Sequence, residues 1–193
     1  MDMGHSKLSK ANSHERILEV ASQRFRQEGV DRVGVSDLMK SAGLTQGGFY
    51  KHFPSKNALV EEAIERALGD GSKIAHSIAS DPRATLGRLV DAYLSIQHRD
   101  NLPHGCAVTA MASDVARSTD VARGSYTRQV AAYVELLQSL LERAGAECTE
   151  DEALAVLSTM VGALSMSRAV NDEKASERIL LASAASIKQR IKR

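Results

Sequence analysis

Apolar residues recur at helical spacing along most of this chain, and turn or cap residues separate the resulting segments. The first apolar face consists of Ile17, Val20, Ala21 and Phe25. It predicts a helix over residues 13–28, with Ser13 as a candidate N-cap and Gly29 as its stop. Residues 1–12 are polar, and we expect them to form a flexible N-terminal arm.

A second apolar face ends in a tight turn. It consists of Val35, Leu38, Met39 and Ala42. Gly43 then suits a left-handed helix stop, and Thr45 suits an N-cap. Phe49 and Phe53 are spaced to pack on one side of a further helix over residues 46–53. The pattern is therefore a helix, a tight turn and a second helix.

The outer side of this second helix combines small, aromatic and cationic residues. They are Gln46, Gly47, Gly48, Tyr50, Lys51 and His52. Such a surface suits a polyanion. Adjacent glycines cost roughly 1 kcal/mol each in helix propensity, so the pair favours a role in letting the backbone approach a ligand closely.

Six further helices are predicted after Pro54. The fourth helix of the chain, capped by Ser55, runs through Gly69-Asp70-Gly71 to about Ser80. The fifth begins at Asp81-Pro82 and is interrupted at Asp100-Asn101-Leu102-Pro103. The others span residues 105–117, 121–144, 149–170 and 173–192, and the eighth begins with a Thr149–Glu152 capping box. The sequence therefore predicts an all-α, nine-helix fold.

The turn and the helices around it resemble a known family. The residues that carry the resemblance are Gly43, Thr45, Gly47, Phe49-Tyr50, His52-Phe53, Ser55-Lys56 and Leu59. In order and spacing they are similar to the helix-turn-helix signature of TetR-type (TetR/AcrR family) transcriptional repressors. The resemblance covers about residues 13–60 and implies that residues 46–53 form a recognition helix in the DNA major groove. The DNA contacts that we expect are Ser36, Thr45, Gln46, Gly47, Gly48, Tyr50, Lys51, His52 and Lys56.

Composition and charge divide the chain in two. All three phenylalanines lie within the first 53 residues, so we expect an aromatic core there and an aliphatic core in the remainder. Residues 1–56 hold nine Lys/Arg against six Asp/Glu, and the remainder holds sixteen against eighteen, for a net charge of +1. The positive field coincides with the helix-turn-helix. We expect a DNA-binding domain over residues 13–57 and a ligand-binding and dimerisation domain over residues 58–193.

The last two predicted helices are rich in small apolar residues, which allow helices to approach closely. These residues include Ala155, Gly162, Ala163, Ala182, Ala184 and Ala185. The resemblance implies that both helices pair with their two-fold mates in a homodimer, which would bind a palindromic operator in double-stranded DNA. Packing within a single chain is the alternative.

The resemblance also implies a small-molecule effector that lowers DNA affinity from a cavity in the C-terminal domain. Candidate wall residues are Tyr93, Cys106, Met111, Tyr126, Met160 and Met166. This set is more apolar than charged, so we expect an apolar effector. Alternatively, these residues are plain core, and the chain is a helical ligand-binding module without DNA binding.

Cys106 follows Pro103-His104-Gly105 at a predicted helix start, where a helix N-terminus and a histidine would stabilise a thiolate. One interpretation is a repressor that senses oxidants or electrophiles through Cys106, and the other is a buried core cysteine. The spacing of His98, His104 and Cys106 matches no closed metal site. With Cys148 as the only other cysteine, a reducing cytosol fits.

Several classes of protein are disfavoured. We find no phosphate-binding loop, nucleophile elbow or helical metal motif, so we expect neither an enzyme nor a cofactor. The N-terminus has no apolar signal region, and the chain has no run of 18 or more apolar residues. We therefore expect a cytoplasmic regulator without membrane contact.

Overall fold

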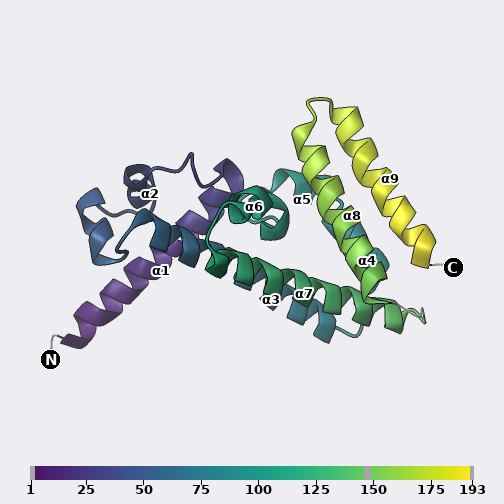
Figure 1. The fold of residues 1–193 in the computed structure, drawn as a ribbon, viewed down its shortest axis with the longest axis horizontal. Coiled ribbons are helices and arrows are strands. Elements are labelled where there is room, and N and C mark those ends of the chain that lie inside the picture. Colours follow the sequence, from purple (N-terminus) through teal and green to yellow (C-terminus); the bar gives the residue numbers. More distant parts are fainter. Residues whose placement is uncertain (1–2, 146–148, 192–193) are drawn as a thin grey trace.

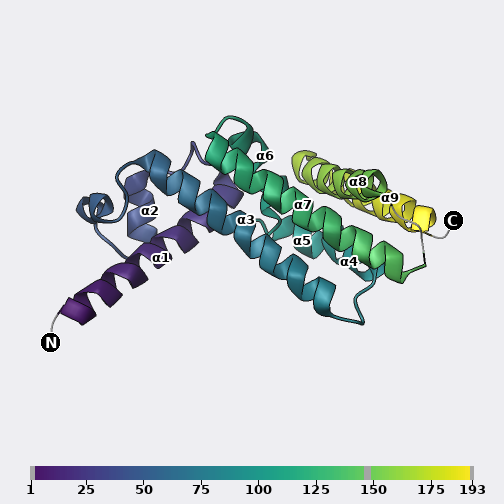
Figure 2. The same ribbon diagram turned by 60° about the horizontal axis from the view of Figure 1, so that its bottom comes forward.

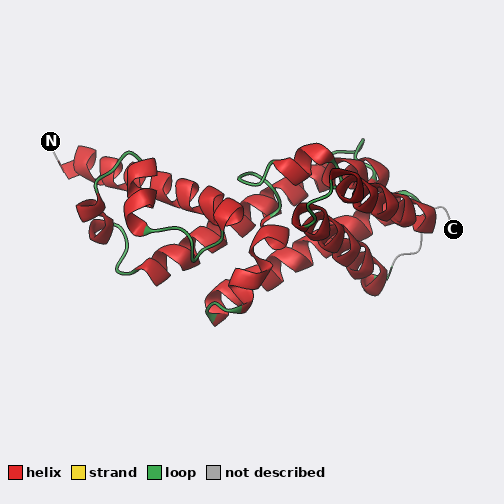
Figure 3. Cartoon of the chain, turned by 90° about the horizontal axis from the view of Figure 1, so that it is seen from above, coloured by secondary structure: helices red, strands yellow, loops and turns green. Residues whose placement is uncertain are grey.

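The computed structural model describes residues 3–145 and 149–191. Within these ranges all regular structure is helical (Figure 3), which confirms the all-α prediction. The helices are α1 (Met3–Glu28), α2 (Val35–Ser41), the 3₁₀ helix η1 (Gln46–Lys51), α3 (Lys56–Ser80), α4 (Leu86–Tyr93), α5 (Ile96–Asp100), α6 (Ala107–Ala116), α7 (Asp120–Arg143), α8 (Glu150–Ala169) and α9 (Glu173–Ile191).

The helices form an elongated molecule. Helices α1 and α2 lie at one end, and the antiparallel pair α8 and α9 lies at the other (Figure 1). Helix α3 starts beside the first group and runs alongside α7 over much of its length (Figure 2), the most extensive helix pairing in the chain. Helices α3 and α7 therefore connect the α1–α2 end of the molecule to the α8–α9 end through continuous helix contacts.

Local capping signals predicted most helix ends correctly. Gly29, Gly43 and Gly145 adopt φ values of +83°, +67° and +79°, and among the described residues only these glycines have positive φ. Residues with a Cβ atom are strained at positive φ, so a glycine is favoured at each of these positions. Each of the three glycines ends a helix, as the sequence predicts. The side chain of Ser55 caps α3, and Thr149 with Glu152 forms the predicted capping box of α8.

Three helix boundaries differ from the prediction. Helix α1 begins at Met3, so residues 3–12 are helical and not a flexible arm. The helix predicted to start at Asp81-Pro82 is α4, and it begins at Leu86. The Thr85 side chain accepts the capping hydrogen bond from the Arg88 N–H, so Thr85 and not Asp81 is the N-cap. Ser95 caps a separate short helix, α5, so the described residues contain one helix more than the nine predicted.

The cores of the two ends differ as the composition suggested. Phe25, Phe49 and Phe53 are all fully buried, and Phe49 stacks on Phe53 with ring centroids 5.7 Å apart. Beyond α3 the buried apolar side chains of the described residues are mostly aliphatic, such as Leu137 and Leu140 of α7, and none of them is aromatic. The aromatic cluster fixes η1 against α1 and α2, which presents the opposite side of η1 to solvent.

Helix α3 runs uninterrupted through two glycines that have different surroundings. A Cβ atom on Gly71 would lie 2.6 Å from the Tyr133 hydroxyl oxygen and 3.3 Å from the Gln129 side chain, both on α7. A Cβ atom on Gly69 would have no neighbour within 4 Å. Gly71 therefore permits the close approach of α3 and α7, whereas Gly69 has no such role.

This difference predicts opposite effects of two alanine substitutions. Gly69→Ala should raise the free energy of unfolding by roughly 1 kcal/mol, because alanine is the better helix former. Gly71→Ala should lower it by about 1 kcal/mol, because overpacking against Tyr133 outweighs the same gain. Urea unfolding of both variants measures the difference. Equal stabilisation at both positions would show that the approach of α3 and α7 needs no glycine.

Candidate functional site

Helix η1 presents a polar outer surface. Gln46, Gly47, Tyr50 and Lys51 are exposed, and Tyr50 keeps 77% of its surface accessible although it is aromatic. Residues three apart eclipse one another in a 3₁₀ helix, so Gly47 lies in line with Tyr50. The segment was predicted as an α-helix, but the tighter helix still turns these residues outward.

The remaining predicted DNA contacts lie around η1. Ser36, in the first turn of α2, is exposed, and so is Thr45. Thr45 occupies the predicted N-cap position, but its side chain makes no capping hydrogen bond. Gly48, His52 and Lys56 are half-buried. We call the whole set the recognition surface, which consists of Ser36, Thr45, Gln46, Gly47, Gly48, Tyr50, Lys51, His52 and Lys56.

Two histidines lie at the edge of η1: His52, a member of the recognition surface, and His14 of α1. The His14 ring stacks on Phe53 with centroids 4.5 Å apart, and its Nε2 lies 2.8 Å from a Glu62 carboxylate oxygen. His14 thereby joins α1 to α3 across the end of η1. Burial, and then the nearby His14, lower the pKa of His52 from its ordinary value, which favours a neutral ring.

A cavity of about 380 Å³ lies near the middle of the molecule. It is lined by Arg26, Ala67, Asp70, Gly71, Ile74, Leu89, Ala92, Tyr93, His98, His104, Gly105, Cys106, Ala107 and Tyr133. A smaller space of about 80 Å³ shares four of these walls and continues toward Leu157 and Met160 of α8. The size and mixed lining are typical of a small-molecule site.

Hydrogen bonds hold the Cys106 end of the cavity in place. The backbone N–H of Cys106 donates to His98 Nε2 at 3.1 Å, so His98 Nδ1 carries the proton and donates to the Tyr93 carbonyl at 2.7 Å. Burial lowers the pKa of His98, which keeps the ring neutral as this arrangement requires. Burial, and then the Cys106 sulfur, raise the pKa values of Tyr93 and Tyr133, so both hydroxyls keep their protons.

The predicted ligand contacts divide into two groups. Tyr93 and Cys106 line the larger cavity, and Met160 lines the smaller one. Three other residues line neither space: Met111 is fully buried core, Tyr126 donates to the Val108 carbonyl at 2.9 Å, and Met166 is 58% exposed on α8. For these three, the structure corrects the prediction that they line the cavity.

Cys106 is only 8% exposed and is part of the cavity wall. Its sulfur faces the two tyrosine hydroxyls, and such burial suits the core interpretation. The sensor role stays a prediction, and Cys148, its intended reference, lies outside the described residues.

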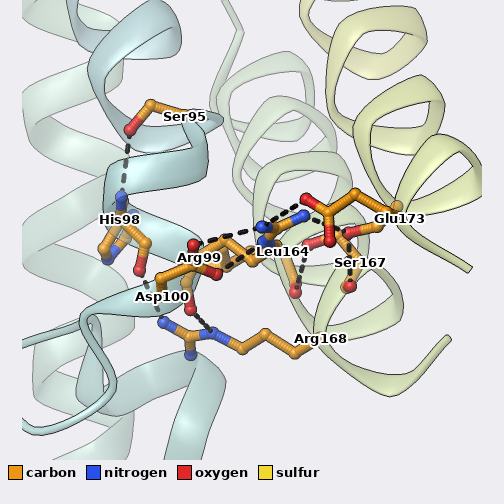
Figure 4. A network of polar contacts seen from close by, with 9 residues as sticks. Ser95, His98, Arg99, Asp100, Leu164, Ser167, Arg168 and Glu173 are labelled. Carbon is orange, nitrogen blue, oxygen red and sulfur yellow. Dashed lines mark hydrogen bonds and ion pairs between the residues drawn. The ribbon is translucent and has the colours of Figure 1, made fainter. Parts of the chain in front are cut away.

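A polar network ties the cavity wall to the C-terminal helices (Figure 4). The Arg99 guanidinium donates to Asp100 at 2.7 Å, Glu173 at 2.9 Å and Ser176 at 2.8 Å. Hydrogen bonds to Asp100 and Glu173 raise the pKa of Arg99, so it stays charged. Arg168 of α8 donates to the carbonyls of His98 and Arg99. Helix α5 is therefore fastened to α8 and to the start of α9.

Helices α8 and α9 also expose large apolar side chains. Leu154, Met166, Val170 and Leu181 are exposed, and Leu181 keeps 70% of its surface accessible. Ala163 and Ala184, by contrast, are buried within the chain, so part of the small-residue pattern serves intrachain packing. We call the four exposed residues the α8–α9 apolar face.

Across residues 3–145 and 149–191, no helix is long and apolar enough to span a membrane.

Comparison with known proteins identifies the family. Residues 17–63 match the model described as bacterial regulatory proteins of the tetR family, and residues 82–182 match that of the tetracyclin repressor-like C-terminal domain. An uncharacterized HTH-type transcriptional regulator of Bacillus subtilis, YvdT, is 40% identical over 58 residues, 30% of each chain. The HTH-type transcriptional repressor KstR2 of Rhodococcus jostii is 34% identical over 84 residues, 42% of this chain and 41% of its own length. The chain thus matches less than half the length of these two relatives.

Solved structures show the same fold over nearly the whole chain. A TetR-family regulator from Agrobacterium tumefaciens superposes with a TM-score of 0.77 at 17% identity, covering 94% of this chain and 98% of its own. The reduced form of E. coli NemR gives 0.75 at 19% identity, covering 92% and 96%. Because the C-terminal family model spans more than half of the sequence and the N-terminal model coincides with the helix-turn-helix, the chain belongs to the TetR family of bacterial regulatory proteins.

Proposed function

We propose that this protein is a sequence-specific DNA-binding transcriptional repressor that a small molecule releases from its operator. The recognition surface carries the proposal, because buried Phe49 and Phe53 fix η1 while Tyr50 and Lys51 point to solvent. KstR2, a relative in this region, is named as a repressor. The proposed DNA-binding domain spans residues 13–57, and the ligand-binding and dimerisation domain spans residues 58–193. Its place of action is the cytoplasm.

The α8–α9 apolar face supports a homodimer. Large apolar side chains exposed on the adjacent helices α8 and α9 favour burial against a second copy, and a two-fold axis would pair each helix with its mate. Two copies present two recognition surfaces, which suits a palindromic operator whose half-sites lie about one helical turn apart.

The cavity supports the release step. Its walls come from α1, α3, α4, α5, α7, the segment before α6 and the first residue of α6, so a ligand would touch helices on both sides of the long α3–α7 pair. Arg99 and Arg168 tie the α5 side of the wall to the proposed dimer contact. Effector binding would favour a spacing of the recognition surfaces that no longer matches successive major grooves.

Lys51→Ala tests the DNA interface directly. A lysine on a phosphate displaces counterions, so the plot of log affinity against log salt should become shallower by about 0.9 per contact. The measurement is a mobility-shift titration at several salt concentrations, on DNA from upstream of the protein's own gene. Lys73→Ala is the matched control, because Lys73 is an exposed lysine on α3 outside the recognition surface. An unchanged slope for Lys51→Ala would remove this residue from the interface.

A further inference from the structure

We propose that Arg26 is the anchor for a negatively charged headgroup, so that the effector is an organic anion with an apolar tail. The inference rests on the proposed function, since it names the class of molecule that occupies the same cavity. It revises the sequence-based expectation of an apolar effector. Arg26 lies in the last turn of α1 and lines the cavity.

Arg26 is a partly buried arginine without an acceptor. Its Nε is shielded from solvent and makes no hydrogen bond, and no ion pair involves Arg26 within the described part of the chain. The other arginines near it are satisfied: Arg24 donates twice to Glu28, and Arg168 donates to two backbone carbonyls. A shielded guanidinium nitrogen without an acceptor costs free energy, so a role in binding would explain its presence.

The nearest carboxylate is already engaged. Asp70 attracts Arg26 electrostatically, but its Oδ2 lies 3.3 Å from Arg66 Nε and its Oδ1 lies 3.3 Å from Lys73 Nζ. His98 cannot accept from Arg26 either, because its Nε2 accepts from Cys106 and its Nδ1 donates to Tyr93. Burial lowers the pKa of Arg26, but guanidinium groups stay protonated in proteins, so the positive charge remains. An incoming anion would supply the missing acceptor.

The rest of the cavity fits a tail. Ile74, Leu89, Tyr93 and Tyr133 line both spaces, and Leu157 and Met160 of α8 line the smaller one. A molecule with its charge at Arg26 would therefore extend an aliphatic or aromatic part toward α8. Carboxylate is the simplest headgroup, because the guanidinium fork pairs with it through two parallel hydrogen bonds.

Calorimetric titration with octanoate and with octanamide, which matches it in shape but is neutral, tests the inference. We expect the full-length protein to bind octanoate about tenfold to a hundredfold more tightly than octanamide. Arg26→Met keeps most of the apolar stem and should abolish this preference. Arg24→Met is the matched control on the same helix, since Arg24 does not line the cavity, and it should keep the preference. Without ligand, Arg26→Met should also melt at a higher temperature than the native protein.

The proposal is overturned if octanoate does not bind, if it binds no more tightly than octanamide, or if Arg26→Met keeps the preference. A lower melting temperature for ligand-free Arg26→Met would instead assign Arg26 a structural role, against the proposal. These readings use no DNA, so they are independent of operator binding. If the native protein bound no DNA in the mobility-shift titration, that result would contradict the proposed function and leave the anion preference standing.

Discussion

Leu181→Glu should turn the dimer into folded monomers and weaken operator binding by about 100-fold or more. Leu181 is 70% exposed on α9, so a single chain accommodates a carboxylate there without strain. In a dimer built on the α8–α9 apolar face, that carboxylate would be buried without a partner, which costs several kcal/mol. A monomer holds only one recognition surface and loses the gain from binding two half-sites at once.

The measurement is sedimentation equilibrium, followed by a mobility-shift titration of the same sample. Val121→Glu is the control, because Val121 is also an exposed apolar residue but lies in the first turn of α7. It should stay dimeric and bind DNA normally. A dimeric Leu181→Glu protein would place the interface elsewhere. Ala163 is unsuitable for this test because it is buried within the chain, so a glutamate there would unfold the protein.

Gly47→Leu should abolish specific DNA binding without destabilising the fold. A Cβ atom at Gly47 would meet nothing within 4 Å, so the protein has room for a side chain there. Replacing an exposed helical glycine should even stabilise the fold by up to about 1 kcal/mol. The added bulk would project beside Tyr50 and hold the η1 backbone away from the DNA. Gly47→Leu should therefore change DNA affinity and the free energy of unfolding in opposite directions.

Gly69→Leu provides the matched control, because Gly69 is an open helical glycine on α3 outside the recognition surface. Both variants should unfold at urea concentrations at or above that of the native protein, and only Gly47→Leu should fail in a mobility-shift titration. Native affinity of Gly47→Leu would show that the η1 backbone does not approach DNA.

Features determined by neighbouring residues could be predicted from the sequence. The stops at Gly29, Gly43 and Gly145 and the capping box at Thr149 depend on a few adjacent residues. The break at Ser95 was missed because its apolar neighbours keep helical spacing on both sides, and only the Ser95 side chain, which accepts from the His98 N–H, marks it. The short, tight form of η1 was missed because Phe49 and Phe53, four residues apart, also fit one face of an α-helix.

The recognition surface and the cavity also differ in how far the sequence could predict them. The recognition surface comes mostly from one short segment, so its residues could be proposed from their spacing together with the family resemblance that this segment carries. The cavity collects residues from helices far apart in sequence, and periodicity identifies buried faces without showing which ones enclose a space. Arg26 thus fell within the DNA-binding domain predicted over residues 13–57, although it lines the cavity. Met166 looked like a wall residue and lies outside, on the α8–α9 apolar face.

Selection from a pool of random DNA duplexes tests the central claim most directly. The full-length protein would be incubated with the pool, bound duplexes would be recovered over several rounds, and the recovered sequences would be compared. The account predicts one enriched palindromic motif with half-sites about one helical turn apart, bound at least about 1,000-fold more tightly than unselected DNA. Recovery of duplexes without a common motif would contradict it.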